Sequence, residues 1–496
     1  SADLCLEGLP SIPTNSQIKN RTHPSQNLRS PSKQPLPWDK HWQPCHDTAI
    51  SAFDAGAHLH CTCATFLLSC PLCVFRPFPS ASAATDLCSA TADIMSAEGR
   101  SCPLSYRYTP AHIREGHTVA ASSAYVVGGL YGNTEALRTL LDLHASEHRL
   151  LKELGMDGEP ALIFSGDFNS FNAFDGDFQH VNEAVVGDGK GSNTWATAGN
   201  VEVEIAKDTV DADTGCGCAY PPYVDDGVVA RSNEIIRILH QTARRFSAIQ
   251  QRLSQLPKHV RLTVEPCGRD PDAPSCTFAV VHGDTHSLAG WSLGAEEVPS
   301  AEVVRRCLSD DGAMCENDSG DGCGVEFLRR FTADCDAMGV SGVLSTHTCL
   351  PVAVAYKSSS GAMRVLFNNG SAGMPNFSLL PLGYTNKHQA PTAGVITRVA
   401  HPSVGPTSLL REKALRMGRP SCVALARRLP LPLYSALIPG RAVVEAIPLA
   451  YDRVAWLNRF LSCWPIGSPA HVSYFSRMVY GPKSYGLREA VRGLVH

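Results

Sequence analysis

Five short polar motifs, rich in glycine, asparagine, aspartate or histidine, recur along the middle of this chain and constrain its fold more than any other feature. They are GGLYGN (Gly128–Asn133), GDFN (Gly166–Asn169), GNVE (Gly199–Glu202), VHGD (Val281–Asp284) and STHTCLP (Ser345–Pro351). Strand and helix signals alternate around them, which favours an α/β fold.

The segments around the first two motifs carry this alternation most clearly. Ala124–Val127 is a short apolar run, and Thr134–Leu151 has apolar residues at helical spacing, with Asn133 placed to cap that helix. Ala161–Ser165 predicts a second strand, and Phe174, Phe178, Val181 and Val185 form the apolar stripe of the helix that follows. Two consecutive strand–loop–helix units are therefore expected.

Later segments extend the pattern. Apolar residues at helical spacing predict one long helix over Asp225–Leu256, ended by Pro257. A return to strand and helix is expected at Val443–Leu449 and Ala455–Leu461. Five further strands are predicted at Thr277–Val281, Val340–Ser345, Val352–Tyr356, Arg364–Phe367 and Val395–Val399.

Composition narrows the class of protein. The 496 residues are 44% hydrophobic and 18% charged, enough for a substantial core, and the net charge of −4 offers no overall attraction for nucleic acid or an anionic membrane. The longest apolar run, Ala64–Phe75, is shorter than the roughly 20 residues that span a bilayer. The 19 cysteines form no CxxC array, so we expect free thiols in a reducing intracellular compartment, either cytoplasm or an organelle.

The chain divides by composition into four parts. Residues 1–94 lack Met and have no periodic apolar pattern. Three alternatives are open for them: a disordered tail, a targeting segment, or sequence upstream of the true start. Residues 95–400 carry the motifs, 401–442 form a Pro- and Arg-rich linker or surface insertion, and 443–496 return to the same domain. Within the second part, residues 309–324 read as an acidic, Gly-rich surface insertion.

In this order the five motifs resemble the signature of the calcineurin-like metallophosphoesterases, which runs DxH(G)N, GDxx, GNHE, HG and GHxH. The resemblance covers roughly residues 103–400 and implies a four-layer α/β sandwich of two mixed β-sheets flanked by helices. It also implies a centre in which cations neutralise phosphate oxygens and lower the pKa of a bound water.

The resemblance implies a specific ligand set. Asp167 takes the place of the bridging carboxylate, and Asn200, His282 and His347 complete the set of one metal; the same four are the catalytic candidates. Their loops are expected at the carboxyl ends of neighbouring strands.

Four positions depart from the family signature. Gly129 and Tyr131 replace the aspartate and histidine of DxH, Val201 replaces the histidine of GNHE, and Cys349 replaces the last histidine of GHxH. Loss of a carboxylate favours one ion over two, and manganese, zinc or iron are the candidates. Cys349 stays a candidate ligand because a thiolate suits zinc or iron, and Tyr131 could supply a phenolate to iron.

Each site residue also has a structural explanation. Asp167 could end a strand in a turn, and His282 and His347 could be buried, hydrogen-bonded histidines. His286 reads more simply as a polar loop residue than as a phosphate contact. The CxC at Cys216–Cys218 reads as a Gly-rich turn, with metal chelation or thiol redox chemistry as the alternatives.

The leading hypothesis is therefore a metal-dependent phosphoesterase that acts on a small-molecule phosphate ester or a phosphoprotein through a metal-activated water. The rival is a catalytically inactive metallophosphoesterase-like protein that binds a phosphate-containing ligand or partner, and the four departures favour it. No nucleic-acid or membrane partner is expected, and the oligomeric state is left open.

Overall fold

Two six-stranded mixed sheets form the centre of the computed structural model, which describes residues 100–187, 193–209, 215–268, 273–308, 322–379 and 394–493. In one sheet β2, β3 and β4 are parallel, while β10, β11 and β12 are antiparallel to their neighbours. Its strand order is β11 (Tyr434–Ile438), β12 (Ala442–Leu449), β10 (Gly394–Ala400), β2 (Ser123–Val127), β3 (Ala161–Ser165) and β4 (Thr194–Thr197).

The other sheet is mixed as well. β1 and β5 are parallel, as are β6, β7 and β9, while β5–β6 and β8–β9 are antiparallel pairs. Its strand order is β1 (Thr118–Ala121), β5 (His259–Val264), β6 (Cys276–Val281), β7 (Gly342–Ser345), β9 (Met363–Asn369) and β8 (Pro351–Lys357).

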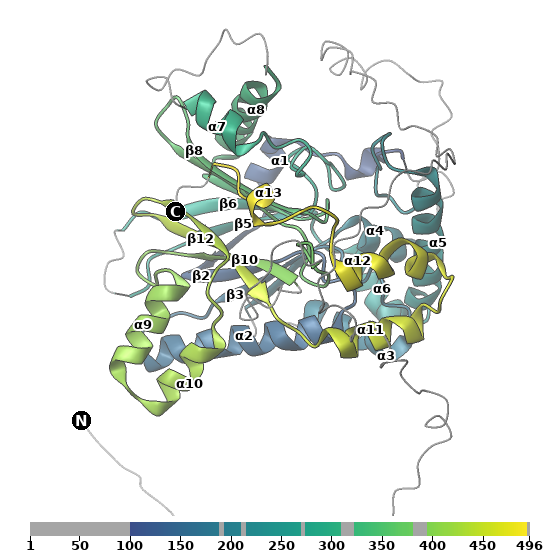
Figure 1. Ribbon diagram of the computed structural model, residues 1–496, viewed down its shortest axis with the longest axis horizontal. Coiled ribbons are helices and arrows are strands. Elements are labelled where there is room, and N and C mark those ends of the chain that lie inside the picture. Colours follow the sequence, from purple (N-terminus) through teal and green to yellow (C-terminus); the bar gives the residue numbers. More distant parts are fainter. Residues whose placement is uncertain are drawn as a thin grey trace, which may run out of the picture. The chain divides into compact units, whose positions relative to one another are not determined.

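The helices lie outside the two sheets, and Figure 1 shows α2 on one side of them and α7 and α8 on the opposite side. The helices of the first half are α1 (Pro110–Arg114), α2 (Thr134–Glu153), α3 (Asp175–Val186), α4 (Asn200–Ala206), α5 (Asp226–Ala243) and α6 (Ser247–Ser254). The later ones are α7 (Ala301–Leu308), α8 (Gly322–Met338), α9 (Thr407–Met417), α10 (Pro420–Arg428), α11 (Arg453–Cys463), α12 (Ser476–Tyr480) and α13 (Leu487–Ala490), with short helices η2 (Leu104–Tyr106) and η3 (His471–Phe475).

Alternation along the strands divides the buried side chains into two clusters. Val126 of β2 and Ile163 of β3 point between the sheets, where they join Phe278 and Phe367 of the other sheet. Their neighbours on the strands, such as Phe164, face the outer side and pack with α2. The fold is thus two mixed sheets face to face with helices outside, as expected.

Local signals set several of these elements. The side chain of Asn133 accepts hydrogen bonds from the backbone N–H groups of Glu135 (3.1 Å) and Ala136 (3.0 Å), so it caps α2 as predicted. The strand predicted at Ala161–Ser165 coincides with β3.

The single helix expected over Asp225–Leu256 is wrong, because a turn at residues 244–246 separates α5 from α6. The backbone N–H of Phe246 bonds to the carbonyl of Ala243 (2.8 Å), and the Phe246 ring packs on Phe178 of α3, with ring centroids 5.4 Å apart. Both helices bury apolar residues, so helical spacing alone did not reveal the turn.

Residues 401–442, expected to be a linker or surface insertion, contain α9, α10 and β11, and β11 pairs with β12 as the edge strand of a central sheet. The expectations for residues 1–94, and for 309–321 of the acidic insertion, lie outside the described residues. Among the described helices none is both long and apolar enough to cross a membrane.

Candidate metal centre

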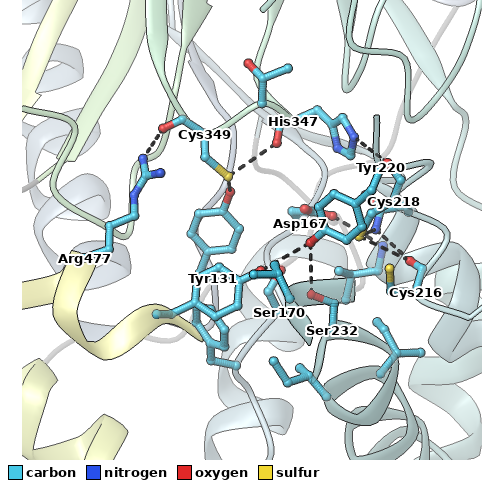
Figure 2. A pocket seen from close by; sticks show the side chains of 18 of the residues that line it. Tyr131, Asp167, Ser170, Cys216, Cys218, Tyr220, Ser232, His347, Cys349 and Arg477 are labelled. Carbon is cyan, nitrogen blue, oxygen red and sulfur yellow. Dashed lines mark hydrogen bonds between the residues drawn. The ribbon is translucent and has the colours of Figure 1, made fainter. Parts of the chain in front are cut away.

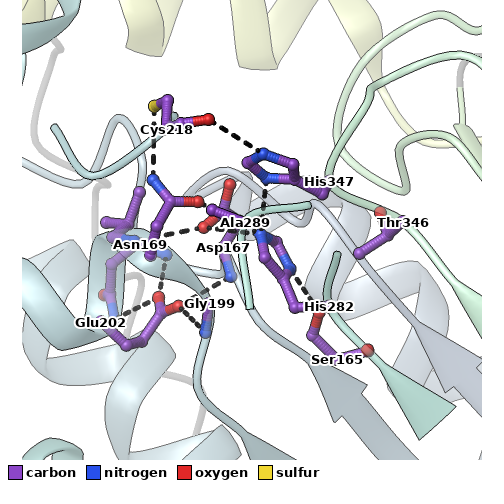
Figure 3. Close-up of polar contacts among 12 residues, drawn as sticks. Ser165, Asp167, Asn169, Gly199, Glu202, Cys218, His282, Ala289, Thr346 and His347 are labelled. Carbon is purple, nitrogen blue, oxygen red and sulfur yellow. Dashed lines mark hydrogen bonds and ion pairs between the residues drawn. The ribbon is translucent and has the colours of Figure 1, made fainter. Parts of the chain in front are cut away.

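The four candidate ligands come from elements that end at one place. Asp167 follows β3, His282 follows β6, His347 follows β7, and Asn200 is the first residue of α4. The Ser165 hydroxyl donates to the Val281 carbonyl (3.0 Å), which ties the end of β3 in one sheet to the end of β6 in the other. The loops after the strands therefore meet across the two sheets, as Figure 3 shows.

His282 lies at the middle of the group. Its Nε2 is 3.1 Å from Nδ1 of His347, 3.3 Å from Oδ1 of Asn200 and 3.4 Å from Oδ1 of Asp167. Ligand atoms of a tetrahedral zinc ion, each about 2.0–2.1 Å from the metal, are roughly 3.3–3.4 Å apart. The observed spacings fit one small cation.

The hydrogen bonds of His282, His347 and Asn200 show which of their side-chain atoms face the centre of the group. Nδ1 of His282 is 2.9 Å from the Ser165 carbonyl, and Nε2 of His347 is 3.3 Å from the Cys218 carbonyl. A carbonyl only accepts, so these nitrogens carry the hydrogens and the other ring nitrogens present lone pairs. The Asn200 amide donates to the Cys216 carbonyl (2.9 Å), which turns its oxygen the same way. Two nitrogens and two oxygens thus converge, all of them acceptors.

Electrostatics confirm that this point attracts positive charge. Burial lowers the pKa of His282, but Asp167, the Ser165 carbonyl and Glu202 together raise it more, so the net shift is upward. Burial raises the pKa of Asp167, but the two histidines and the Val201 N–H bring it below its usual value. Burial and the neighbouring His282 lower the pKa of His347 to about 3, so it stays neutral.

Glu202 holds the ligand loops in position. Its carboxylate accepts hydrogen bonds from the backbone N–H groups of Asp167 (2.7 Å), Gly199 (3.0 Å) and Asn169 (3.1 Å). Burial and the neighbouring Asp167 raise its pKa to about 7. The GNVE motif contains Glu202, but we assigned it no role, because its partners become visible only when the loops are brought together.

The backbone of the centre is strained. Non-glycine residues with positive φ are uncommon, and five of the six among the described residues lie at the site: Tyr131 (56°), Asp167 (54°), Ala219 (49°), His347 (37°) and Cys349 (62°). Such conformations persist where surrounding contacts enforce them and often mark functional sites.

Close approach of two loops explains the glycine of GDFN. At Gly166 φ is +78°, and an added Cβ would lie 2.6 Å from the backbone of Gly199 and from the His282 ring. Only glycine lets the two loops come this close.

The residues at the departures from the family signature do not form a second ligand set. The Tyr131 hydroxyl and the Cys349 sulfur are 2.8 Å apart and hydrogen-bonded to each other. Burial raises the pKa of both groups, which keeps them protonated. Among the described His, Cys, Asp and Glu side chains, the group whose ligand atoms all lie within 4.8 Å of one another is Asp167, His282 and His347, without Cys349.

The remaining sequence candidates, His286, Cys216 and Cys218, differ in their position relative to the cavity beside the centre. His286 is half exposed and pairs with Asp334 (3.1 Å), and it does not line the cavity beside the centre. Cys216 and Cys218 do line that cavity, and both are free thiols.

A cavity of about 220 Å³ opens beside the centre (Figure 2). Asp167, Asn200 and His347 line its inner end, and the Trp291 ring packs against His347 with centroids 5.2 Å apart. Ser170, Arg477 and the side chains of α5 that also line it were not predicted as site residues. Arg477 lies more than 100 residues beyond the last motif, in a segment without a recognisable pattern.

Comparisons with known proteins add little beyond the fold. No protein-family model and no curated protein matches the chain. Similar solved structures include a hypothetical protein from Pyrococcus horikoshii OT3 (13% identity, TM-score 0.40, covering 74% of this chain and 100% of that one). They also include a metallophosphoesterase from Sphaerobacter thermophilus (12% identity, TM-score 0.30, 62% and 100%). A protein serine/threonine phosphatase from Saccharomyces cerevisiae with similarity to human phosphatase PP5 is a third (12% identity, TM-score 0.24, 59% and 79%). All three TM-scores are low, and the function is therefore argued from the site.

Proposed function

We propose that this chain is a metal-dependent phosphoesterase whose centre is formed by Asp167, Asn200, His282 and His347. One observation carries the proposal: four buried acceptor atoms from four separate elements converge within the spacing of a single cation. Buried lone pairs that face one another without a donor are costly, so a cation at this point stabilises the folded arrangement.

The donor types suit particular metals. Two imidazoles with one carboxylate and one amide oxygen match zinc, manganese or iron better than magnesium or calcium, which prefer oxygen ligands. A bound ion of this kind lowers the pKa of water and neutralises phosphate oxygens. One ion per chain follows from the single donor set.

The chain's own residues position this centre. Ser165 and Cys218 hold the imidazoles through their carbonyls, which fixes the ring orientations. Glu202 fixes the loop that carries Asp167. The cavity beside the centre is too small to admit a folded phosphoprotein surface and suits a small phosphate ester.

The rival function is that of a non-hydrolytic protein that binds a phosphate-containing ligand. The hydrogen-bonded pair of Tyr131 and Cys349 favours it, since these neutral groups occupy the positions where the family signature has histidines. Gly129 and Val201 remove two further polar groups. The two hypotheses share the site and differ in whether the ester bond is broken.

Metal analysis and hydrolysis assays separate them. We expect about one bound ion per chain, and hydrolysis of p-nitrophenyl phosphate or its diester with added Mn²⁺, Zn²⁺ or Fe²⁺. Asp167→Asn and His347→Ala should abolish both metal retention and activity, while His286→Ala, a matched histidine outside the cavity, should retain them.

Two results would contradict the proposal. Metal retained without turnover of any phosphate ester supports the rival binding protein. Absence of metal from the purified chain, with no uptake of added ions, removes the centre itself.

A further inference from the structure

We propose that the cavity beside the metal centre binds a small phosphate monoester with an apolar, preferably aromatic, organic group, and that Arg477 contacts the phosphate. The inference rests on the proposed function, because it takes the phosphate to be bound next to Asp167 and His347. It identifies the class of ligand and a residue beyond the four metal ligands.

Arg477 is the cationic side chain suited to this role. Among the described residues that line the cavity it is the one lysine or arginine. One of its terminal N–H groups donates to the Cys349 carbonyl, which fixes the guanidinium beside the loop that carries His347, as Figure 2 shows. Its Nε is buried and has no hydrogen-bond partner among the described residues. A planar guanidinium with a free donor matches the oxygens of a phosphate.

A second unused donor also lines the cavity. The hydroxyl of Ser170, directly after the GDFN motif, is buried without a hydrogen-bond partner among the described residues, and Ser170 lines the cavity. Buried polar groups gain from a hydrogen-bond partner, so these two groups at one cavity are available to a polar ligand. Both are donors, which suits an anion.

Most of the remaining cavity wall is apolar. Phe171, Ile235, Ile236, Trp291 and Tyr474 line it, and Asp167 is the one carboxylate among the described lining residues. Largely apolar walls offer few partners to the hydroxyl groups of a sugar, so a nucleotide or sugar phosphate would leave polar groups unpaired. An aromatic or branched apolar group gains from burial there instead.

The size of the cavity limits the ligand further. Its volume of about 220 Å³ lies below the range of roughly 300–1,000 Å³ that is typical of drug-sized ligands. One ring with a phosphate is therefore the appropriate size.

The segment that contributes Arg477 is held in place by contacts with the opposite wall. Arg231 of α5 donates to the Ser473 hydroxyl (2.7 Å), and the hydroxyls of Tyr220 and Tyr474 are 3.5 Å apart. The chain after residue 470 thereby forms one side of the cavity.

Binding of non-hydrolysable phosphonates tests the inference independently of turnover. Calorimetric titration of the metal-loaded protein should show phenylphosphonate binding at least tenfold more tightly than methylphosphonate, because only the former fills the apolar part. Arg477→Gln should weaken both by about tenfold or more, and Arg477→Lys should restore part of the affinity. Arg488→Gln, an exposed arginine of the same C-terminal segment, should change neither.

A steric variant examines the apolar part separately. Val228→Phe, at a half-buried position in the cavity wall, should weaken phenylphosphonate and spare methylphosphonate, while Ala230→Phe on the exposed side of α5 should affect neither. Equal affinity for the two phosphonates, or unchanged binding by Arg477→Gln, overturns the inference. Hydrolysis of phosphate esters alongside such a result leaves the proposed function standing, whereas Arg477-dependent binding without hydrolysis of any ester supports this inference and rejects the proposed function.

Discussion

Glu202→Gln is the substitution that most directly tests how the centre is held together. The carboxylate accepts three backbone N–H groups, from Asp167, Gly199 and Asn169. An amide of the same shape keeps one acceptor oxygen and presents N–H groups where the other oxygen was. In the better of its two orientations the oxygen faces Asp167 and Gly199, which leaves the backbone N–H of Asn169 facing another donor, while the Asn169 side-chain amide keeps its bond to Asn182 (3.2 Å).

The cost follows from that unpaired group. A buried donor without an acceptor costs about 1–3 kcal/mol, and the two retained bonds lose their charge assistance. We therefore expect Glu202→Gln to lower the free energy of unfolding by about 2–3 kcal/mol. Glu202→Ala removes the acceptors for all three N–H groups, and we expect it to lower the free energy of unfolding by about 4 kcal/mol. Metal affinity should fall by about 10–100-fold in either variant, as for other residues that support metal ligands.

Urea unfolding of the metal-free protein and calorimetric metal titration measure the two effects separately. Glu183→Gln, an exposed glutamate of α3, is the matched control and should change neither quantity. An unchanged urea midpoint together with unchanged metal affinity in Glu202→Gln would refute the role that we assign to this carboxylate.

Three further predictions concern other buried groups. Arg398→Met should lower the free energy of unfolding by about 3–5 kcal/mol in urea, because Arg398 is fully buried between Glu147 and Glu445 and its loss leaves both buried carboxylates without an opposite charge. Burial alone raises the pKa of Glu147, but Arg398 holds it below its usual value. The lowered pKa contributes to the stability of the folded protein. That contribution should be complete above about pH 4.3, the pKa of an unfolded glutamate, and be lost as the pH falls through the folded pKa. Acid unfolding of Glu147→Gln should lack that component. Tyr131→Phe and Cys349→Ala should leave the metal content unchanged, because the Tyr131 hydroxyl and the Cys349 thiol are hydrogen-bonded to each other. If metal analysis shows that either variant loses the ion, the substituted residue is a metal ligand.

The elements predicted most accurately are those whose signal is local. The strand before Asp167 and the helix capped by Asn133 are each specified by a few neighbouring residues, and both were located from the sequence. The turn between α5 and α6 was missed because Ile249 continues the apolar spacing of α5, and the reason for the turn is packing of Phe246 on α3. Tertiary contacts of that kind produce no periodic pattern in the sequence.

The site residues also divide into those indicated by local motifs and those revealed only by contacts in the folded chain. Asp167 and His347 were candidates because their motifs resemble parts of the metallophosphoesterase signature, and in the structure they lie together with His282. The residues that complete the site act through distant partners: Glu202 through the loop of Asp167, and Arg477 through Cys349. Neither contact has a fixed sequence spacing, so only the folded chain reveals them.

A count of charges links the departures from the family signature to one ion and one arginine. Asp167 is the one carboxylate among the described residues that line the cavity, so a divalent ion bound to it would leave an excess of about one positive charge among the groups that face the cavity. Arg477 adds a second, and together they balance a phosphate monoester, which carries up to two negative charges. A second divalent ion, for which Gly129 offers no carboxylate, would leave about two further positive charges in a buried site, where unbalanced charge is strongly disfavoured. Under the proposed function, Asp167, one divalent ion and Arg477 would therefore balance the charge of one phosphate dianion.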